Sequence, residues 1–266
     1  MNHFVWPTIV LGVIAFLAGS HLDEKLKVRS SRTAVVIVCV VCALPGVSFA
    51  AYYTKLLGEP IWLYRFRAVP GTELAAAGMG LLAGYIHHAR LKHPILRRQL
   101  RAFTAPTLLA IALFAPYVKP IIRPLRLDPA AERWENGVCL QSTASTCGPA
   151  SAATILRTLG GHASEFELAR DSYTYAGGTE NWYLARAIRG RGHNVEFTKL
   201  QISSDEIPTQ AVAGVKLDHG SGHFISVIGR NGETFTVADP LSGKFAATQG
   251  ELRQQYRFTG FFLLIK

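Results

Sequence analysis

Cysteine is scarce in this chain of 266 residues, with four in all. So few in so long a chain argue against a disulfide framework. None is grouped with histidine at the spacing of a zinc site, so we expect neither a metal ion nor a cofactor. Cys39 and Cys42 lie within an apolar run, where we interpret them as small packing or lipid-facing residues, which leaves Cys139 and Cys147 in the second half.

Acidic residues are scarce in the first part of the chain. Residues 1–122 hold 13 Lys and Arg against 4 Asp and Glu, whereas residues 123–266 hold 15 against 14. The formal net charge of +10 therefore lies almost wholly in the part that also carries long apolar runs. Nucleic-acid binding would need these cations on one face of a folded domain. Positive loops between apolar spans indicate a membrane protein instead, so we expect the lipid bilayer as a partner and no nucleic acid.

Four segments of this first part are candidates for membrane helices, which need about 20 apolar residues each. The N-terminal candidate lacks the basic start and the cleavage site of a signal peptide, so we interpret it as an uncleaved span. Gly80 and Gly84, four residues apart in the third candidate, would allow close helix packing. The predicted spans are residues 4–20, 33–51, 72–89 and 103–122, with three spans as the alternative.

Basic residues in the loops predict the orientation of the spans. With four spans, loops 21–32 and 88–102 share one side and carry nine Lys and Arg, whereas the other side, which includes Arg65 and Arg67, carries six. The more basic side is retained in the cytoplasm. We therefore expect a multi-pass protein of the bacterial inner membrane whose C-terminal part faces outward, and the loss of one span would reverse this.

Prolines punctuate residues 123–137, which we interpret as a linker to a separate domain over residues 138–266. Helices are predicted over residues 147–159, 166–171 and 180–189, the last with Thr179 as N-cap. Strands are predicted over residues 194–200, 210–217, 223–229, 233–239 and 258–265. Asn231-Gly232 is typical of a two-residue hairpin turn. Helices followed by hairpin-linked strands predict an α+β domain with an antiparallel sheet.

The residue types needed for cysteine catalysis occur in this domain. That chemistry requires a nucleophilic thiolate, a base, and an acceptor that orients the base. Cys147 stands at a predicted helix start, a position that favours a thiolate. Gln141 could donate to an oxyanion, and the alternative is a solvated loop residue. The predicted hairpin brings His223 near Asp239, which could orient the imidazole as in a triad.

These motifs, in this order, resemble the bacteriocin-processing cysteine peptidases that cut after a double-glycine leader. The shared elements are a Gln six residues before Cys-Gly (QSTASTCGPASAATIL), a Gly-Thr helix start (GTENWYLARAIRGRGHNVEF), and a Gly-His strand before an Asp-Pro-x-x-Gly turn (GHFISVIGRNGETFTVADPLSG). The resemblance implies a papain-like fold over residues 138–266 and a peptide or protein precursor as substrate. It also implies Cys147 as nucleophile, His223 as base, Asp239 as orienting residue and Gln141 as oxyanion donor.

Two features depart from that family. Thr146 stands where relatives often have Asp before the cysteine. Many relatives are fused to an ABC exporter, whereas this sequence contains no P-loop motif and leaves no room for an ATPase domain. Any exporter is therefore expected to be a separate partner.

Several alternatives stay open. Cys147 could be a buried packing residue, or it could form a disulfide with Cys139 in an oxidising compartment. His219 competes with His223, although its loop position favours an exposed residue. The domain could also be a non-hydrolytic module that binds leader or partner peptides for a separate exporter, or an enzyme with another papain-like chemistry, such as a transglutaminase or an amidase.

Overall fold

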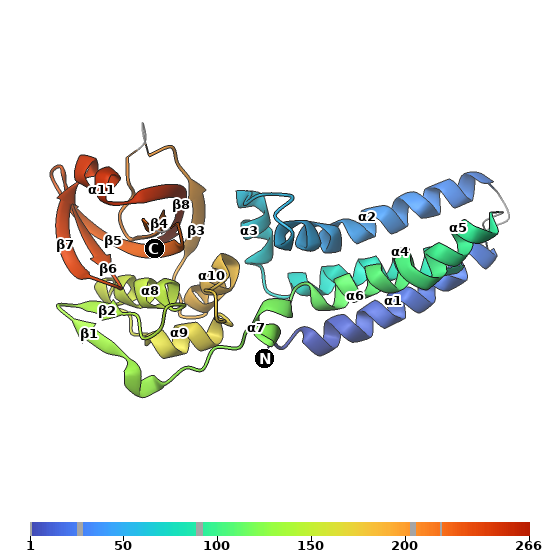
Figure 1. The fold of residues 1–266 in the computed structure, drawn as a ribbon, viewed down its shortest axis with the longest axis horizontal. Helices are drawn as coiled ribbons and strands as arrows, with labels where there is room; N and C mark the ends of the chain where they lie inside the picture. The colour runs from blue at the N-terminus through green and yellow to red at the C-terminus, as the bar shows by residue number, and fades with distance from the viewer. Residues whose placement is uncertain (1, 26–28, 89–92, 203–205, 219) are drawn as a thin grey trace. The chain divides into compact units, whose positions relative to one another are not determined.

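The computed structural model describes residues 2–25, 29–88, 93–202, 206–218 and 220–266 (Figure 1). Its internal contacts divide the chain into two compact units. Unit 1 comprises Met1–Leu63 and Val69–Val118, and unit 2 comprises Tyr64–Ala68 and Lys119–Lys266. A short segment that precedes the third predicted span therefore belongs to the same unit as the C-terminal domain.

Described residues up to Ile122 form helices joined by short connections. These are α1 (Val5–Lys25), α2 (Arg29–Tyr53), α3 (Ile61–Arg67), the 3-10 helix η1 (Thr72–Ala77), α4 (Gly78–His88), α5 (Pro94–Gln99), the π-helical η2 (Leu100–Thr104), α6 (Ala105–Phe114) and α7 (Val118–Ile122). Two segments, Val5–Leu22 and Arg32–Tyr53, are long and apolar enough to cross a membrane, and they coincide with the first two predicted spans. The third and fourth spans are divided among shorter helices and stay predictions.

Glycines let the helices of unit 1 approach closely. α4 contacts α1, α2 and α6. A Cβ atom added at Gly80 would overlap the carbonyl oxygen of Gly12, and one added at Gly84 would overlap that of Phe16. The backbones of α1 and α4 are thus in direct contact, and the close packing predicted from these two glycines is confirmed.

Unit 2 combines helices with an antiparallel sheet, as predicted (Figure 1). A hairpin of β1 (Arg133–Glu135) and β2 (Val138–Leu140) comes first, so the predicted linker ends in a strand. The helices are α8 (Cys147–Thr158), α9 (Glu165–Asp171) and α10 (Asn181–Arg189). The remaining elements are β3 (Val195–Lys199), β4 (Ala211–Lys216), β5 (Gly222–Asn231), β6 (Thr234–Asp239), β7 (Gly243–Thr248), α11 (Gln249–Gln255) and β8 (Arg257–Ile265). The strand order is β3-β8-β4-β5-β6-β7, and β7 and α11 have no counterpart among the predicted elements.

Local sequence explains several helix ends in unit 2. α8 ends before Gly160, whose φ of +82° suits a glycine. α11 begins with a capping box in which the Thr248 and Glu251 side chains bond each other's backbone N–H groups. The predicted cap of α10 is wrong: the N-cap is Glu180, which makes no side-chain capping bond, and the Thr179 hydroxyl bonds another side chain instead.

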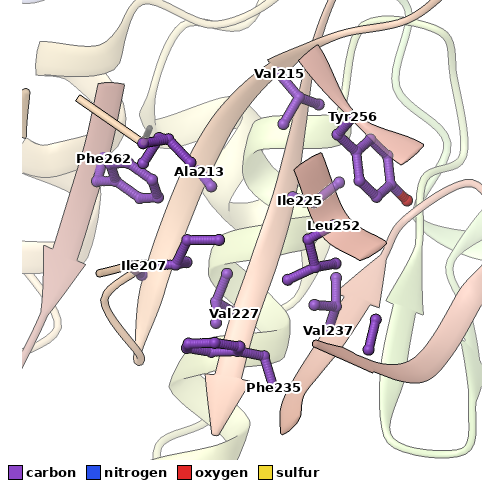
Figure 2. Close-up of a cluster of buried hydrophobic side chains, with 13 residues drawn as sticks. Ile207, Ala213, Val215, Ile225, Val227, Phe235, Val237, Leu252, Tyr256 and Phe262 are labelled. Carbon is purple, nitrogen blue, oxygen red and sulfur yellow. The ribbon is translucent and has the colours of Figure 1, made fainter. Parts of the chain in front are cut away.

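One face of the sheet carries a large cluster of buried apolar side chains (Figure 2). Alternate residues of two neighbouring strands point into it, and Leu252 of α11 packs with them. Tyr256 lays its ring against the same cluster, and its hydroxyl points away from it (Figure 2). The strand residues involved are Ile225 and Val227 of β5 and Phe235 and Val237 of β6. His223 and Asp239 continue these two alternations, so both lie on this face.

Candidate active site

Cys147 is the first residue of α8, as predicted, and it is 9% exposed. Two reciprocal hydrogen bonds attach this helix to β5. The Ser226 hydroxyl donates to the Ser151 carbonyl at 2.9 Å, and the Ser151 hydroxyl donates to the Phe224 carbonyl at 3.1 Å. Ser151 lies about one helical turn after Cys147, so these bonds fix the start of α8 relative to the strand that carries His223.

A β-bulge brings Asp239 onto the same face of the sheet as His223. Asn231 pairs with Thr234, so the turn residues are Gly232 and Glu233, and the predicted turn at Asn231-Gly232 is wrong by one residue. Regular pairing from that turn would put Asp239 opposite Ser226, whose side chain points to the other face from His223. The register shifts between Val227 and Gly229, which makes Ile228 the extra residue of β5. Asp239 then lies opposite Ile225, two residues from His223 and on the same face.

Three donors hold the Asp239 carboxylate. His223 Nε2 lies 2.8 Å from Oδ1, and the Leu241 N–H donates to the same oxygen at 2.8 Å. The Tyr256 hydroxyl donates to Oδ2 at 2.7 Å. Both members of the pair are buried, with His223 5% and Asp239 4% exposed. The carboxylate is therefore fixed in orientation, and it holds the imidazole through Nε2 alone.

The pKa values of the pair move in the directions that favour an ion pair. Burial alone would lower the pKa of His223, but its hydrogen bonds and charge interactions with Asp239 and Cys147 outweigh burial and raise the pKa to about 9. Burial alone would raise the pKa of Asp239, but the hydrogen bonds from His223, Tyr256 and the Leu241 N–H hold it below its usual value. At neutral pH the site thus contains an imidazolium beside a carboxylate. Because Nε2 is engaged with Asp239, Nδ1 is the nitrogen available to Cys147.

Gln141 is attached to this site through its backbone. Its N–H donates to the Pro240 carbonyl at 3.0 Å, next to Asp239. Its side-chain Nε2 donates to the Thr143 carbonyl at 2.8 Å, and within the described residues its buried Oε1 accepts no hydrogen bond. The carboxamide is thus engaged with its own loop, and the role of Gln141 as an oxyanion donor stays a prediction.

Thr146 closes the loop between Gln141 and Cys147. It is fully buried, its Oγ1 accepts from the Thr143 N–H at 3.1 Å, and the same hydroxyl donates to the Thr143 carbonyl at 3.1 Å. An aspartate at this position could accept the same N–H. The departure from the family pattern therefore keeps the loop contact and removes a charge.

Cys139 is a buried packing residue in this structure. All four cysteines are free, so the structure contains no Cys139–Cys147 disulfide. The Cys139 N–H donates to the Thr154 hydroxyl at 2.9 Å, and burial, followed by the charges of Glu165 and Glu132, raises the pKa of its thiol. These effects disfavour a reactive thiolate at Cys139. His219, the other candidate base, lies outside the described residues.

Tyr256 is the site residue that the sequence reasoning missed. It follows α11, whose capping box reads Thr-Gln-Gly-Glu from Thr248, a pattern that is visible in the sequence. Recognising that helix would have placed a tyrosine after a short amphipathic segment, but its contact with Asp239 depends on the tertiary fold. Among the described residues, no group of three or more His, Cys, Asp or Glu could hold a metal ion.

Comparison with known proteins adds a family and several relatives. Residues 135–266 match the model of the Peptidase C39 family. An uncharacterized protein of Methanothermobacter marburgensis is 34% identical over 104 residues, which is 39% of this chain and 71% of the relative. One of Methanothermobacter thermautotrophicus is 28% identical over 129 residues, which is 48% of this chain and 87% of the relative.

Two solved structures are similar to this chain. The peptidase domain of Streptococcus ComA, a bifunctional ABC transporter involved in a quorum-sensing pathway, has 18% identity and a TM-score of 0.41, with 47% of this chain and 94% of that one covered. A double-glycine-motif protease from an AMS/PCAT transporter, solved with its leader peptide, has 20% identity and a TM-score of 0.42, with 54% and 97% covered. The family match runs from the end of β1 through β8.

Proposed function

Because the chain belongs to the Peptidase C39 family, we propose that it is a membrane-anchored cysteine peptidase that cleaves a peptide or protein precursor. The observation that carries this proposal is the His223–Asp239 pair, bonded at 2.8 Å and close enough to Cys147 for the thiol to raise the pKa of the imidazole. A nucleophile, a base and an orienting acceptor are the minimum set for covalent cysteine catalysis.

The reaction would follow from this arrangement. Transfer of the Cys147 thiol proton to His223 Nδ1 produces the imidazolium described above and a thiolate, and the thiolate attacks the carbonyl carbon of the scissile bond. The Cys147 N–H and Gln141 would stabilise the oxyanion, since Gln141 Nε2 has two N–H groups and its bond to Thr143 uses one. His223 then protonates the departing amine, which leaves a thioester on Cys147. Water, deprotonated by His223, hydrolyses the thioester and restores the thiol.

The first part of the chain would anchor this domain. We assign residues 1–122 to a multi-pass region with spans at 4–20, 33–51, 72–89 and 103–122, residues 123–137 to a linker, and residues 138–266 to the peptidase domain. The assignment is supported by the large apolar side chains that α1 and α2 expose, such as Ile14 and Val38, at 54% and 55%. The basic loops would face the cytoplasm and the peptidase domain the other side.

The substrate proposed first is a peptide that contains Gly-Gly, because the chain shares its Gln-Cys, Gly-His and Asp-Pro motifs with leader peptidases. The purified full chain should cleave such a peptide, and Cys147→Ala should lower the turnover at least about 1,000-fold. Cys139→Ala is the matched control, since it removes a thiol that lies in the same unit but is fully buried. Undiminished cleavage by Cys147→Ala would end the proposal.

A second candidate is a peptide-binding module without hydrolysis. The bond from Gln141 Nε2 to the Thr143 carbonyl favours it, because this bond occupies one of the two N–H groups of the amide and holds the carboxamide against its own loop. Such a module would bind the Gly-Gly peptide, leave it intact, and serve a separate exporter.

Assays for ammonia release from glutamine peptides test the remaining papain-like chemistries, those of a transglutaminase or an amidase.

A further inference from the structure

The segment Tyr64–Ala68 belongs to unit 2 although unit 1 flanks it on both sides. The chain enters unit 2 at Tyr64, leaves it after Ala68, and returns at Lys119. The sequence places Arg65 and Arg67 in a loop between spans, but Arg67 and Ala68 are almost completely buried. The interpretation of these residues as a free loop is therefore wrong.

Tyr64 completes an aromatic cluster of unit 2. Its side chain is 1% exposed. Its ring centroid lies 6.0 Å from that of Trp182 on α10, 5.8 Å from Phe197 on β3, and 5.4 Å from Phe261 on β8. Such aromatic pairs stabilise a fold beyond the area that they bury. Tyr64 thus joins one helix and two neighbouring strands.

Arg67 fixes the segment against α10. Its Cζ atom lies 4.5 Å above the Trp182 ring, and its Nη2 donates to the Tyr183 hydroxyl at 3.4 Å. The side chain is 1% exposed. A buried guanidinium is costly unless its surroundings offer acceptors and aromatic faces. The contacts with Trp182 and Tyr183 therefore fix Arg67, and with it the end of α3, against α10.

Two arginines of α10 bind the backbone at the end of the same segment. Arg186 donates to the Arg67 carbonyl, and Arg189 Nη1 donates to the Ala68 carbonyl at 3.2 Å. These carbonyls end helix α3 and need donors from outside the helix. Arg189 Nη2 also donates to the Val195 carbonyl of β3 at 2.8 Å, so one side chain connects the segment to the sheet.

Contacts continue from this segment to the catalytic candidates. Phe261 packs on Tyr64, and its ring centroid lies 6.1 Å from that of Phe224, the residue next to His223. A Cβ added at Gly148, beside Cys147, would lie 3.5 Å from both Leu184 of α10 and Phe224. Of the elements that Tyr64–Ala68 contacts, α10 therefore flanks the nucleophile directly, and β8 is connected to it through Phe224 of β5.

We propose that Tyr64–Ala68 is a structural part of the peptidase domain, supplied from between the second and third predicted spans, and that it holds α10 beside the nucleophile. The topology below rests on the proposed membrane anchoring as well. Because Tyr64–Ala68 is folded into the peptidase domain, it lies on the same side of the bilayer as that domain. The chain then crosses an even number of times between Ala68 and Lys119, which excludes the loss of one span there.

The packing is tested in the full chain by heating. Cys139 is fully buried in unit 2, so its alkylation, mapped by mass spectrometry, reports the opening of that unit. Tyr64→Ala should lower the midpoint of Cys139 exposure by roughly 10 °C, the effect of removing a buried aromatic ring. Trp62→Ala is the matched control, since Trp62 precedes Tyr64 on the same helix but is 55% exposed. Equal midpoints for the two variants would overturn the proposal, whether or not the chain is a peptidase.

The topology is tested with single reporter cysteines and a membrane-impermeant maleimide in a Cys42→Ala chain. Glu59→Cys, just before α3, and Asp128→Cys, in the proposed linker, should be labelled from the same side. Labelling of these two from opposite sides would overturn the proposal. Arg98→Cys should be labelled from the other side. Labelling of all three from one side would agree with the segment and contradict the four proposed spans.

Discussion

The two units place their large apolar side chains in opposite ways. In unit 1, α1 and α2 expose valine, leucine and isoleucine along their length, and 22% of each apolar window is buried. In the described part of residues 123–266, Leu241 is the one large apolar side chain that is exposed, and the others are buried or half-buried, as in the cluster of Figure 2. Water penalises exposed apolar surface of this extent, whereas lipid does not. This difference between the units is the one that the proposed membrane anchoring predicts.

The units also differ in what holds their elements together. The backbones of α1 and α4 touch through Gly80 and Gly84, with no side chain between them. α8 is attached to β5 through reciprocal bonds between Ser151 and Ser226 and their neighbours. Close backbone packing is typical of membrane helices, and satisfied buried polar pairs are typical of a water-soluble core.

The largest effect is expected from the register of β5 in unit 2. Deleting Phe224 should move His223 into the position of Phe224 and turn its side chain away from Asp239, because a one-residue shift exchanges the faces of a strand. We expect turnover to fall at least about 1,000-fold, as when a triad loses its carboxylate. Deleting Ile228 is the control, since it removes the unpaired residue of the bulge and leaves Val227 opposite Val237 and Ser226 opposite Ala238. Equal turnover of the two deletion variants would show that the register between Ile228 and His223 does not set the site.

That bulge also marks the limit of the sequence reasoning. The start of α8 and the strands that carry His223 and Asp239 could be predicted, because Cys-Gly-Pro, Gly160 and alternating apolar residues act locally. The register could not be predicted, because an inserted residue such as Ile228 has no local signature and is stabilised by the neighbouring strands. A count from the predicted turn places the two residues near each other but does not decide their faces.

Arg67 shows the same limit at longer range. In the sequence it is one of several basic residues between two predicted spans, and the charge count includes it as such. Its burial depends on Trp182 and Tyr183, which lie on a helix far along the chain. Recognising it would require contacts between distant segments, which periodicity does not report. Because Arg65 and Arg67 belong to a folded unit, they do not count as free loop cations, and the excess on the predicted cytoplasmic side grows.

The next prediction concerns an arginine substituted for an exposed apolar residue in each unit. Val41 of α2 is 56% exposed and Leu241 of unit 2 is 53% exposed. If α2 spans the bilayer, Val41→Arg should cost about 3 kcal/mol of insertion free energy, roughly a 100-fold shift. Leu241→Arg should leave insertion unchanged, because that side chain faces water. Equal insertion of the two variants, measured by membrane fractionation, would contradict the assignment of lipid to unit 1.

The free energy of unfolding of unit 2 should depend on pH through His223. The folded-state pKa of His223 is raised to about 9, above its ordinary value. Its contribution to stability is therefore complete below about pH 6.5 and is lost as the pH rises through about 9. The free energy of unfolding should therefore fall by on the order of 3 kcal/mol over this pH range. Urea unfolding followed by Cys139 alkylation at pH 6 and pH 10 measures it, and a drop of the same size in His223→Gln would refute this origin.

The smallest effect concerns the hydroxyl that the sequence reasoning missed. Tyr256→Phe keeps the ring in the apolar cluster and removes the bond to Asp239 Oδ2. We expect turnover to fall about 10-fold, the usual cost of one hydrogen bond to a charged group. The pKa of Asp239 should rise, so the acidic limb of the pH–rate profile should move to higher pH. A purely structural role would change the midpoint of thermal unfolding and leave that limb in place.

The central claim is that Cys147, activated by His223, is the reactive thiol of the chain. Iodoacetamide labelling of the folded full chain at neutral pH tests it directly, with each cysteine followed by mass spectrometry in wild type and His223→Gln. We predict that Cys147 is labelled well before Cys139 and that its rate falls markedly in His223→Gln. Labelling of Cys147 no faster than that of Cys139, or unaffected by His223→Gln, would contradict the account.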